Sequence, residues 1–109
     1  MYLKKLKNIV SPVFFRLQSS YDGTLGDTKI EQYTDEKQCI FSLKSSVQIS
    51  RLTLVYTGLA KIVVYVTHGG LDSPENQSFV LPLKELSEGA LTEILENFIK
   101  EYKSCIENK

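Results

Sequence analysis

A change of hydrophobic period near Ser87 is the feature that most constrains the fold of this chain. Ahead of that residue, apolar and polar side chains alternate in several short segments, which is typical of strands with one buried face. After it, apolar side chains recur every three or four positions, which is typical of an amphipathic helix. This helical stripe consists of Leu91, Leu95, Phe98, Tyr102 and Cys105. The pattern predicts a sheet followed by one long helix, with Ser87 as the residue that caps the helix.

Several segments of the first part have the composition of strands. TKIEQY (28–33) and QCIFSLK (38–44) are joined by TDEK and predict a hairpin. AKIVVYV (60–66) is the most continuously apolar segment, which predicts a central strand covered on both faces. SFVLPLK (78–84) contains Pro82, which has no N–H to donate, so this strand is expected to lie at an edge of the sheet or to end at the proline.

The segment SVQISRLTLVY (46–56) changes phase along its length. Val47 and Ile49 share one face of an extended chain, whereas Leu52 and Leu54 share the other. Such a shift of one residue predicts a β-bulge, or a bend between two sheets.

The segment VFFRLQSS (13–20) also alternates and predicts a further strand with one buried face. Alternation places Phe14 and Phe15 on opposite faces, so one of the two rings is expected to be exposed. An exposed ring beside polar side chains can anchor a protein partner or stack on a nucleobase. The predicted partner-binding residues are Phe14, Arg16, Gln18 and Tyr33.

These patterns predict a single domain of the α+β class, residues 1–109, because a chain of this length has no room for a second core. The expected architecture is an antiparallel sheet or open barrel of five to seven strands, closed by one C-terminal amphipathic helix. Residues 1–10 are expected to form an arm or short helix, 13–83 the β-rich body and 87–107 the helix.

Charge and composition narrow the functional classes. Lys plus Arg and Asp plus Glu both number 13, so no overall field draws the chain to polyanions. Arg16 and Arg51 are the only arginines, which leaves few groups that grip phosphate bidentately. No apolar run approaches the ~20 residues that span a membrane, and the N-terminal lysines are not followed by the apolar segment of a signal peptide. A cytoplasmic protein with Cys39 and Cys105 reduced is expected.

His68, the only histidine, is the first candidate for chemistry because it follows an apolar run, in the sequence THGG. A general base or metal ligand needs partners, and the only acid nearby in sequence is Asp72. The interpretation favoured by the sequence is structural, with His68 opening a loop that runs to Asn76. The segment YDGTLGDT lacks the ligand pattern of an EF-hand and the lysine of a P-loop, so it is expected to be a hairpin loop. No catalytic, cofactor-binding or metal-binding residues are predicted, and the chain is not expected to be an enzyme.

Small size, neutral charge and the lack of a catalytic constellation favour a non-enzymatic protein-binding module. An adaptor, an inhibitor or immunity-type protein, or an assembly subunit from a phage or other mobile element would fit this description. An edge strand can also pair with a second copy of itself and give a homodimer.

The alternative hypothesis is a single-stranded nucleic-acid-binding protein that uses sheet aromatics with Lys29, Lys44, Lys61 and Arg51. The layout of a last strand that enters an amphipathic helix, SFVLPLKELSEGALTEILENFIKEY, resembles the end of Whirly-like and Pur-type single-stranded-nucleic-acid-binding folds. Bacterial pleckstrin-homology-like barrels end in a similar helix, so the layout does not separate the hypotheses. A third possibility is a small apolar ligand held between helix and sheet.

Overall fold

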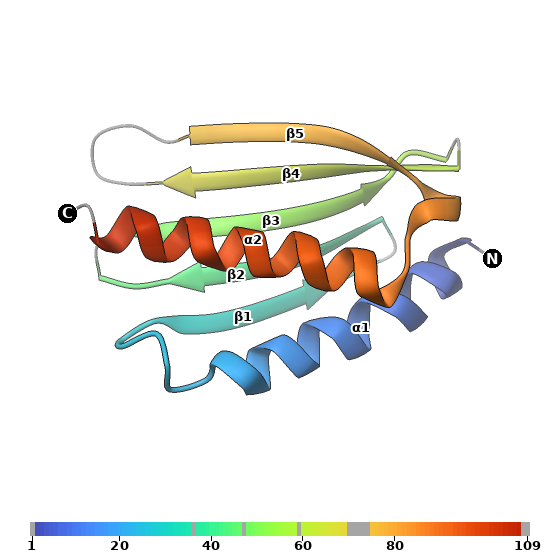
Figure 1. Ribbon diagram of the computed structural model, residues 1–109. Helices are drawn as coiled ribbons and strands as arrows, with labels where there is room; N and C mark the ends of the chain where they lie inside the picture. The colour runs from blue at the N-terminus through green and yellow to red at the C-terminus, as the bar shows by residue number, and fades with distance from the viewer. Residues whose placement is uncertain (1, 36, 47, 59, 70–74, 108–109) are drawn as a thin grey trace.

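The computed structural model describes residues 2–35, 37–46, 48–58, 60–69 and 75–107, and their side chains except those of 2–7 and 75–76. Over these residues the chain forms one five-stranded antiparallel sheet in which each strand pairs with the next one along the sequence. A helix precedes the sheet, and a short 3-10 helix and a second long helix follow it (Figure 1). The elements are α1 (Tyr2–Tyr21), β1 (Lys29–Thr34), β2 (Gln38–Lys44), β3 (Ile49–Tyr56), β4 (Lys61–Gly69), β5 (Glu75–Pro82), η1 (Leu83–Glu85) and α2 (Glu88–Glu107).

Both long helices lie on the same face of the sheet. In Figure 1, α2 runs across the middle strands while α1 runs alongside β1. The predicted α+β class with an antiparallel sheet is confirmed, and the sheet is open, because β1 and β5 are its two ends. The predicted C-terminal helix is present, and Ser87 caps it by accepting a hydrogen bond at Oγ from the Ala90 N–H at 3.1 Å.

The core fills the layer between the helices and the sheet. Its centre is a series of edge-to-face aromatic contacts that joins three elements. The ring centroids of Phe14 on α1 and Phe41 on β2 lie 5.2 Å apart, and those of Phe41 and Phe98 on α2 lie 6.4 Å apart. All three side chains are buried, so this series holds both helices against one face of the sheet.

The strand predicted over residues 13–20 is wrong, because this segment is the second half of helix α1. Among the described side chains of α1, the buried ones are those of Val10, Val13, Phe14 and Leu17, which have the spacing of one helical face. The segment appeared to alternate because it has only eight residues. Over so short a stretch, several positions fit both the stripe of a helix and the period of two of a strand. The helix also contains Pro12, which removes one backbone hydrogen bond without ending the element. The β-rich part of the chain therefore begins at Lys29.

The predicted hairpin is confirmed, with β1 and β2 in register from Lys29 opposite Lys44 to Thr34 opposite Cys39. Asp35 holds its turn by accepting hydrogen bonds from the N–H groups of Lys37 and Gln38 at 2.7 and 2.9 Å. These two bonds favour the carboxylate form and lower the pKa of Asp35. By contrast, YDGTLGDT is not a hairpin loop, since it joins α1 to β1.

The prediction for the last strand is also confirmed, because β5 is at the edge of the sheet and ends at Pro82. The prediction for β4 holds only in part. This strand lies inside the sheet, but Tyr65 on its second face is 46% exposed, so the helices cover a single face. The continuously apolar sequence of β4 therefore places apolar side chains on an uncovered surface.

The predicted bulge near the start of β3 is wrong over the described residues, since β3 pairs with β4 without interruption from Ile49 to Tyr56. The inward positions continue at Gln48 and Ser50, which are both buried, and then at Leu52. Polar residues occupy these inward positions, and Ile49 points outward, which gave the sequence the appearance of a phase shift. Val47, part of that prediction, lies outside the described residues.

Neither helix of the described part of the chain combines the length and hydropathy that crossing a membrane requires.

The packing of α1 against the sheet predicts unequal losses of stability for two neighbouring rings. Replacing Phe14 with Ala should lower the free energy of unfolding by about 3–5 kcal/mol, since it empties a core position. Replacing Phe15, which is 69% exposed, with Ala should change it by less than about 0.5 kcal/mol. Urea unfolding followed by circular dichroism measures both values, and equal losses would contradict this packing.

Candidate functional site

His68 lies inside the core and not at the start of a loop, because β4 continues through Gly69. The side chain is buried on the inner face of the sheet, and its ring stacks on Phe98 of α2 at a centroid distance of 5.5 Å. Asp72, the acid that the sequence placed nearby, lies outside the described residues. The structure instead gives His68 two partners that are distant in sequence.

These partners form a polar chain that crosses from the sheet to α2. Ser50, the residue opposite His68 on β3, has its Oγ 2.8 Å from His68 Nδ1. On the other side of the ring, His68 Nε2 is 2.8 Å from Oε2 of the half-exposed Glu101. Gln48 adds a further contact by donating from Nε2 to Ser50 Oγ at 3.3 Å. We refer to Gln48, Ser50, His68 and Glu101 as the histidine network.

The direction of the hydrogen bonds follows from the chemistry of the groups. The Glu101 carboxylate can only accept, so His68 donates to it through Nε2–H. In the neutral ring with its hydrogen on Nε2, Nδ1 accepts and the Ser50 hydroxyl donates to it. Among the described residues, no buried side-chain nitrogen or oxygen lacks a hydrogen-bond partner. The histidine network thus satisfies polar groups that would be costly to bury alone.

Serine, histidine and a carboxylate are also the residue types of hydrolytic triads. In such a triad the serine oxygen must reach the substrate, whereas Ser50 has 0% of its surface exposed and lies between the sheet and the helices. The arrangement therefore connects β3, β4 and α2, and presents no accessible nucleophile. Sequence reasoning missed Ser50 and Glu101 as partners of His68, although polar residues in the inward phase of β3 were a signal.

The second candidate is the face of the sheet that no helix of the described residues covers, which we call the open face. Two neighbouring rows of side chains on it are rich in apolar groups. The strand register places Tyr33, Ile40, Thr53 and Tyr65 in one row across β1 to β4, and Val55, Val63 and Val80 in the next row across β3 to β5. We refer to Tyr33, Ile40, Val55, Val63, Tyr65 and Val80 as the apolar band.

Cations flank the apolar band at both ends of the strands. Lys29 and Lys44 face each other across β1 and β2, and Arg51 lies on β3 on the same side of the band. Lys61 lies on the other side, at the start of β4. All four are exposed, and they are the cations that the alternative sequence hypothesis named. The structure brings them to one face because each occupies an outward position of its strand.

A shallow cavity of about 310 Å³ lies at one end of β1 and β2 on this side. Lys29 and Lys44 line it together with Asp27 and Glu31, and Ser45 and Ser46 complete its polar lining. Two carboxyl groups beside two ammonium groups offset each other's charge, so this cavity is a poor site for a small anion.

The predicted partner-binding residues do not form one patch. Phe14 is in the core, and Arg16 on α1 donates a hydrogen bond to Thr92 Oγ1 on α2. Gln18 is also on α1 and contacts β1. Of the four predicted residues only Tyr33 lies on the open face. The other three are on a helix that covers the opposite face, so the predicted patch is not a continuous surface.

No group of three or more His, Cys, Asp or Glu side chains within the described ranges is arranged to hold a metal ion. Cys39 is buried in β2 and Cys105 is half-buried on α2. They lie on different elements, and no disulfide joins them in the part of the chain that the structure describes.

The histidine network predicts a specific loss of stability. Replacing His68 with Ala leaves the buried Ser50 hydroxyl without its acceptor, which costs about 1–3 kcal/mol in addition to the cavity. Replacing Thr67, the preceding residue on the other face of β4, with Ala serves as the matched control and should cost less than about 1 kcal/mol. Chemical unfolding of both variants tests this, and equal losses would argue against a supporting role.

The open face and the histidine network lie on opposite sides of the sheet, so the two candidates are independent of each other. The first is an accessible surface with apolar and cationic groups, and the second is a buried connection between elements. No protein-family model, curated protein or solved structure matches this chain.

Proposed function

We propose that the protein is a non-enzymatic protein-binding module and that the apolar band is its binding surface. The observation that carries this proposal is the exposure of large apolar side chains on a sheet face that no helix of the described residues covers. Tyr65 and Val80 are 46% and 57% exposed, and Tyr33 is exposed to a similar extent. Contiguous exposed apolar groups of this kind mark interaction surfaces.

The arrangement of groups on the open face fits a protein partner. Protein interfaces combine an apolar, aromatic-rich centre with a polar rim, and tyrosine is among the residues that contribute most to affinity. Here Tyr33 and Tyr65 belong to the apolar band, while Arg51 and the lysines lie around it. The band is built on strands of one sheet, so little backbone conformational freedom is lost when a partner binds.

The charged groups around the apolar band indicate the kind of partner that would fit it. Lys29, Lys44, Arg51 and Lys61 project from the strands of the open face, where Glu31 is the only carboxyl group among the described strand residues. Asp27 and Glu31 line the cavity beside Lys29 and Lys44 and offset their charge. A partner with an apolar centre and with Asp or Glu side chains opposite Arg51 and Lys61 complements this pattern. An adaptor, an inhibitor or immunity-type protein, or an assembly subunit acting in the cytoplasm would use such a surface.

The proposal is tested by altering the apolar band, keeping the fold intact and measuring whether a partner still binds. Wild-type protein, the variant Tyr33→Ala/Tyr65→Ala and the control Phe15→Ala are used as bait in nuclease-treated lysate of the source organism. Phe15 is an exposed aromatic residue on the helix side. A protein bound by the wild type and the control but not by the double variant is then purified, and its affinity is measured by calorimetry. We expect replacement of Tyr65 alone to weaken binding about 30-fold.

The opposite pattern would overturn the proposal. If the double variant retains full affinity while Phe15→Ala loses it, the binding surface is on the helix side. Circular dichroism of each variant confirms that a loss of affinity is not a loss of fold.

A single-stranded nucleic acid is the second candidate ligand, because four cations and two exposed tyrosines share the open face. Tyr33 and Tyr65 are three strands apart, which is about 14 Å. Neighbouring bases of a stacked strand are about 3.4 Å apart, so the two rings cannot both stack on adjacent bases. This separation ranks the nucleic acid behind a protein partner.

Salt dependence separates the two candidates. If four cations neutralise phosphates, the logarithm of the affinity for a fluorescent oligonucleotide should fall with the logarithm of salt concentration with a slope of about −3. Replacing Lys44 with Gln should then reduce that slope by about 0.7. Fluorescence anisotropy gives both slopes, and a lack of binding at low salt excludes the nucleic acid.

A further inference from the structure

The outer edge of β5 is a surface distinct from the apolar band. β5 is the last strand of the sheet, and it pairs with β4 through an unbroken register from Pro82 opposite Lys61 to Glu75 opposite His68. Within the described residues no strand pairs with its other side. An unpaired edge presents a row of backbone N–H and C=O groups to which a further strand can add.

The side chains of β5 do not protect this edge. Proteins usually guard exposed edges with charged residues, prolines or bulges. The sequence from Asn76 to Leu81 contains no charged residue, and Pro82 stands only at the end of the strand. The pairing with β4 shows no bulge. Phe79 and Val80, in the second half of β5, are exposed. The edge is thus eight residues long, has no bulge in its pairing with β4, and is uncharged from Asn76 to Leu81.

The opposite edge of the sheet is different. Gln18 on α1 reaches β1 and donates from Nε2 to the Ile30 carbonyl at 3.1 Å. Lys29 and Glu31 also lie on β1 and are exposed. The two edges are therefore not equivalent, and a strand that adds to β5 has no matching edge at β1 from which the sheet could continue. Association through β5 closes after one pairing.

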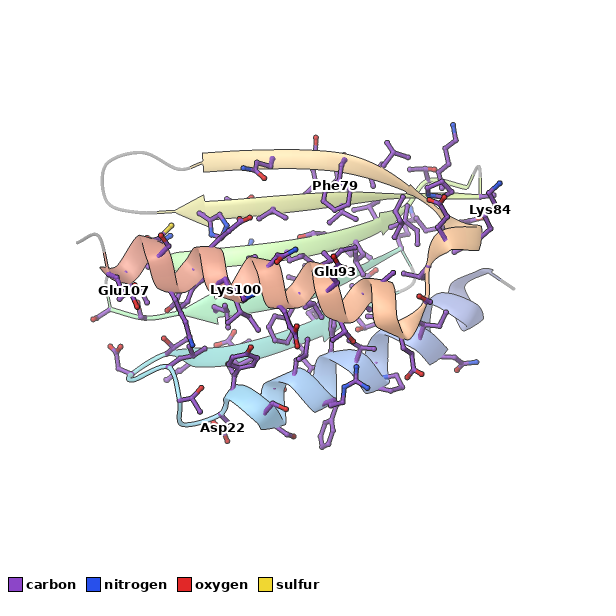
Figure 2. All side chains as sticks on the ribbon, in the orientation of Figure 1. Asp22, Phe79, Lys84, Glu93, Lys100 and Glu107 are labelled. Atoms are coloured by element: carbon purple, nitrogen blue, oxygen red, sulfur yellow. The ribbon has the colours of Figure 1, made fainter. Side chains whose placement is uncertain are left out.

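The inner side of β5 also lacks a cover. Phe79 is paired with Val64, which is fully buried, yet Phe79 itself is 43% exposed. The reason is that α2 packs over β3 and β4 and stops short of β5. Figure 2 shows Phe79 beside α2 and not beneath it. A chain that lies along β5 on this side would cover the ring.

We infer that β5 pairs antiparallel with β5 of a second copy of this chain and forms a two-fold symmetric dimer. A two-fold axis perpendicular to the sheet keeps the helices of both copies on the same side. Pairing centred on Phe79 opposes this ring to its counterpart and Ser78 to Val80 of the second copy. Because the strand is uncharged between Asn76 and Leu81, this antiparallel pairing opposes no like charges.

This dimer leaves the open face accessible and extends it. Val80 is the member of the apolar band on β5, so the bands of two copies would adjoin at the dimer axis. The resulting surface has two equivalent halves and would bind its partner bivalently, a consequence that rests on the proposed function. The dimer itself does not depend on that function.

The first experiment measures the mass of the purified full-length chain by light scattering across a range of concentrations. The wild type is expected to be a dimer, and the variant Phe79→Lys/Val80→Lys a monomer, since lysine on an edge strand opposes pairing. Tyr33→Lys, a substitution at an equally exposed residue on β1, is the matched control and should remain dimeric. A monomeric wild type, or a dimer that survives the double substitution, would overturn the inference.

Cysteine cross-linking tests the geometry without disturbing the edge. In a Cys105→Ser background, single cysteines are placed at Gln77, Ser78, Phe79 and Val80, and disulfides are read on a non-reducing gel after mild oxidation. A disulfide needs Cα atoms about 4.4–6.8 Å apart, so only a residue near the two-fold axis bonds to its own counterpart. We expect this residue to be at or beside Phe79. Gln32→Cys on β1 is the control, and a cross-link at Gln32 that exceeds those on β5 would place the interface elsewhere.

Discussion

One-sided coverage of the sheet is the constraint on which the rest of the structure depends. The aromatic series of Phe14, Phe41 and Phe98 fastens both helices to the same face, so all the fully buried large side chains gather in one layer. A strand exposes every second side chain on its other face whatever its sequence. Where the sequence is apolar at those outward positions, as it is on β4, the surface must be apolar. The open face is therefore a direct consequence of where the helices pack.

Coverage of this face by the helices also buries the histidine network at one end of the core. The inward positions Gln48 and Ser50 carry polar groups, and burial of such groups is costly without partners. His68 is hydrogen-bonded to Ser50 through Nδ1 and to Glu101 on α2 through Nε2. Hydrogen bonds have directional requirements that apolar contacts lack. The network thus restricts the position of α2 along β3 and β4, beyond what the apolar stripe of the helix would do alone.

Local patterns in the sequence predicted the elements whose signals are local. The β1–β2 hairpin, the β5 edge ending at Pro82 and the Ser87-capped α2 all follow from residues close together in the chain. The failures have two causes, an ambiguous local pattern and the arrangement of distant residues in space. The segment 13–20 reads as a strand because a short window does not distinguish the two periods, and the partner of His68 on α2 is far away in sequence. The lysines of the open face were identifiable as a type, but their common face depends on the register of separate strands.

A five-stranded open sheet has two faces and two edges, and α1 and α2 account for only part of them. The helices cover the inner face except at β5, and Gln18 meets the β1 edge. The open face and the β5 edge remain, and Val80 belongs to both. Because pairing at the edge uses backbone groups in the plane of the sheet, it leaves the outward side chains exposed. The proposed self-association and the proposed partner binding would therefore use different groups of the same strand, so a second copy and a partner could be held at once.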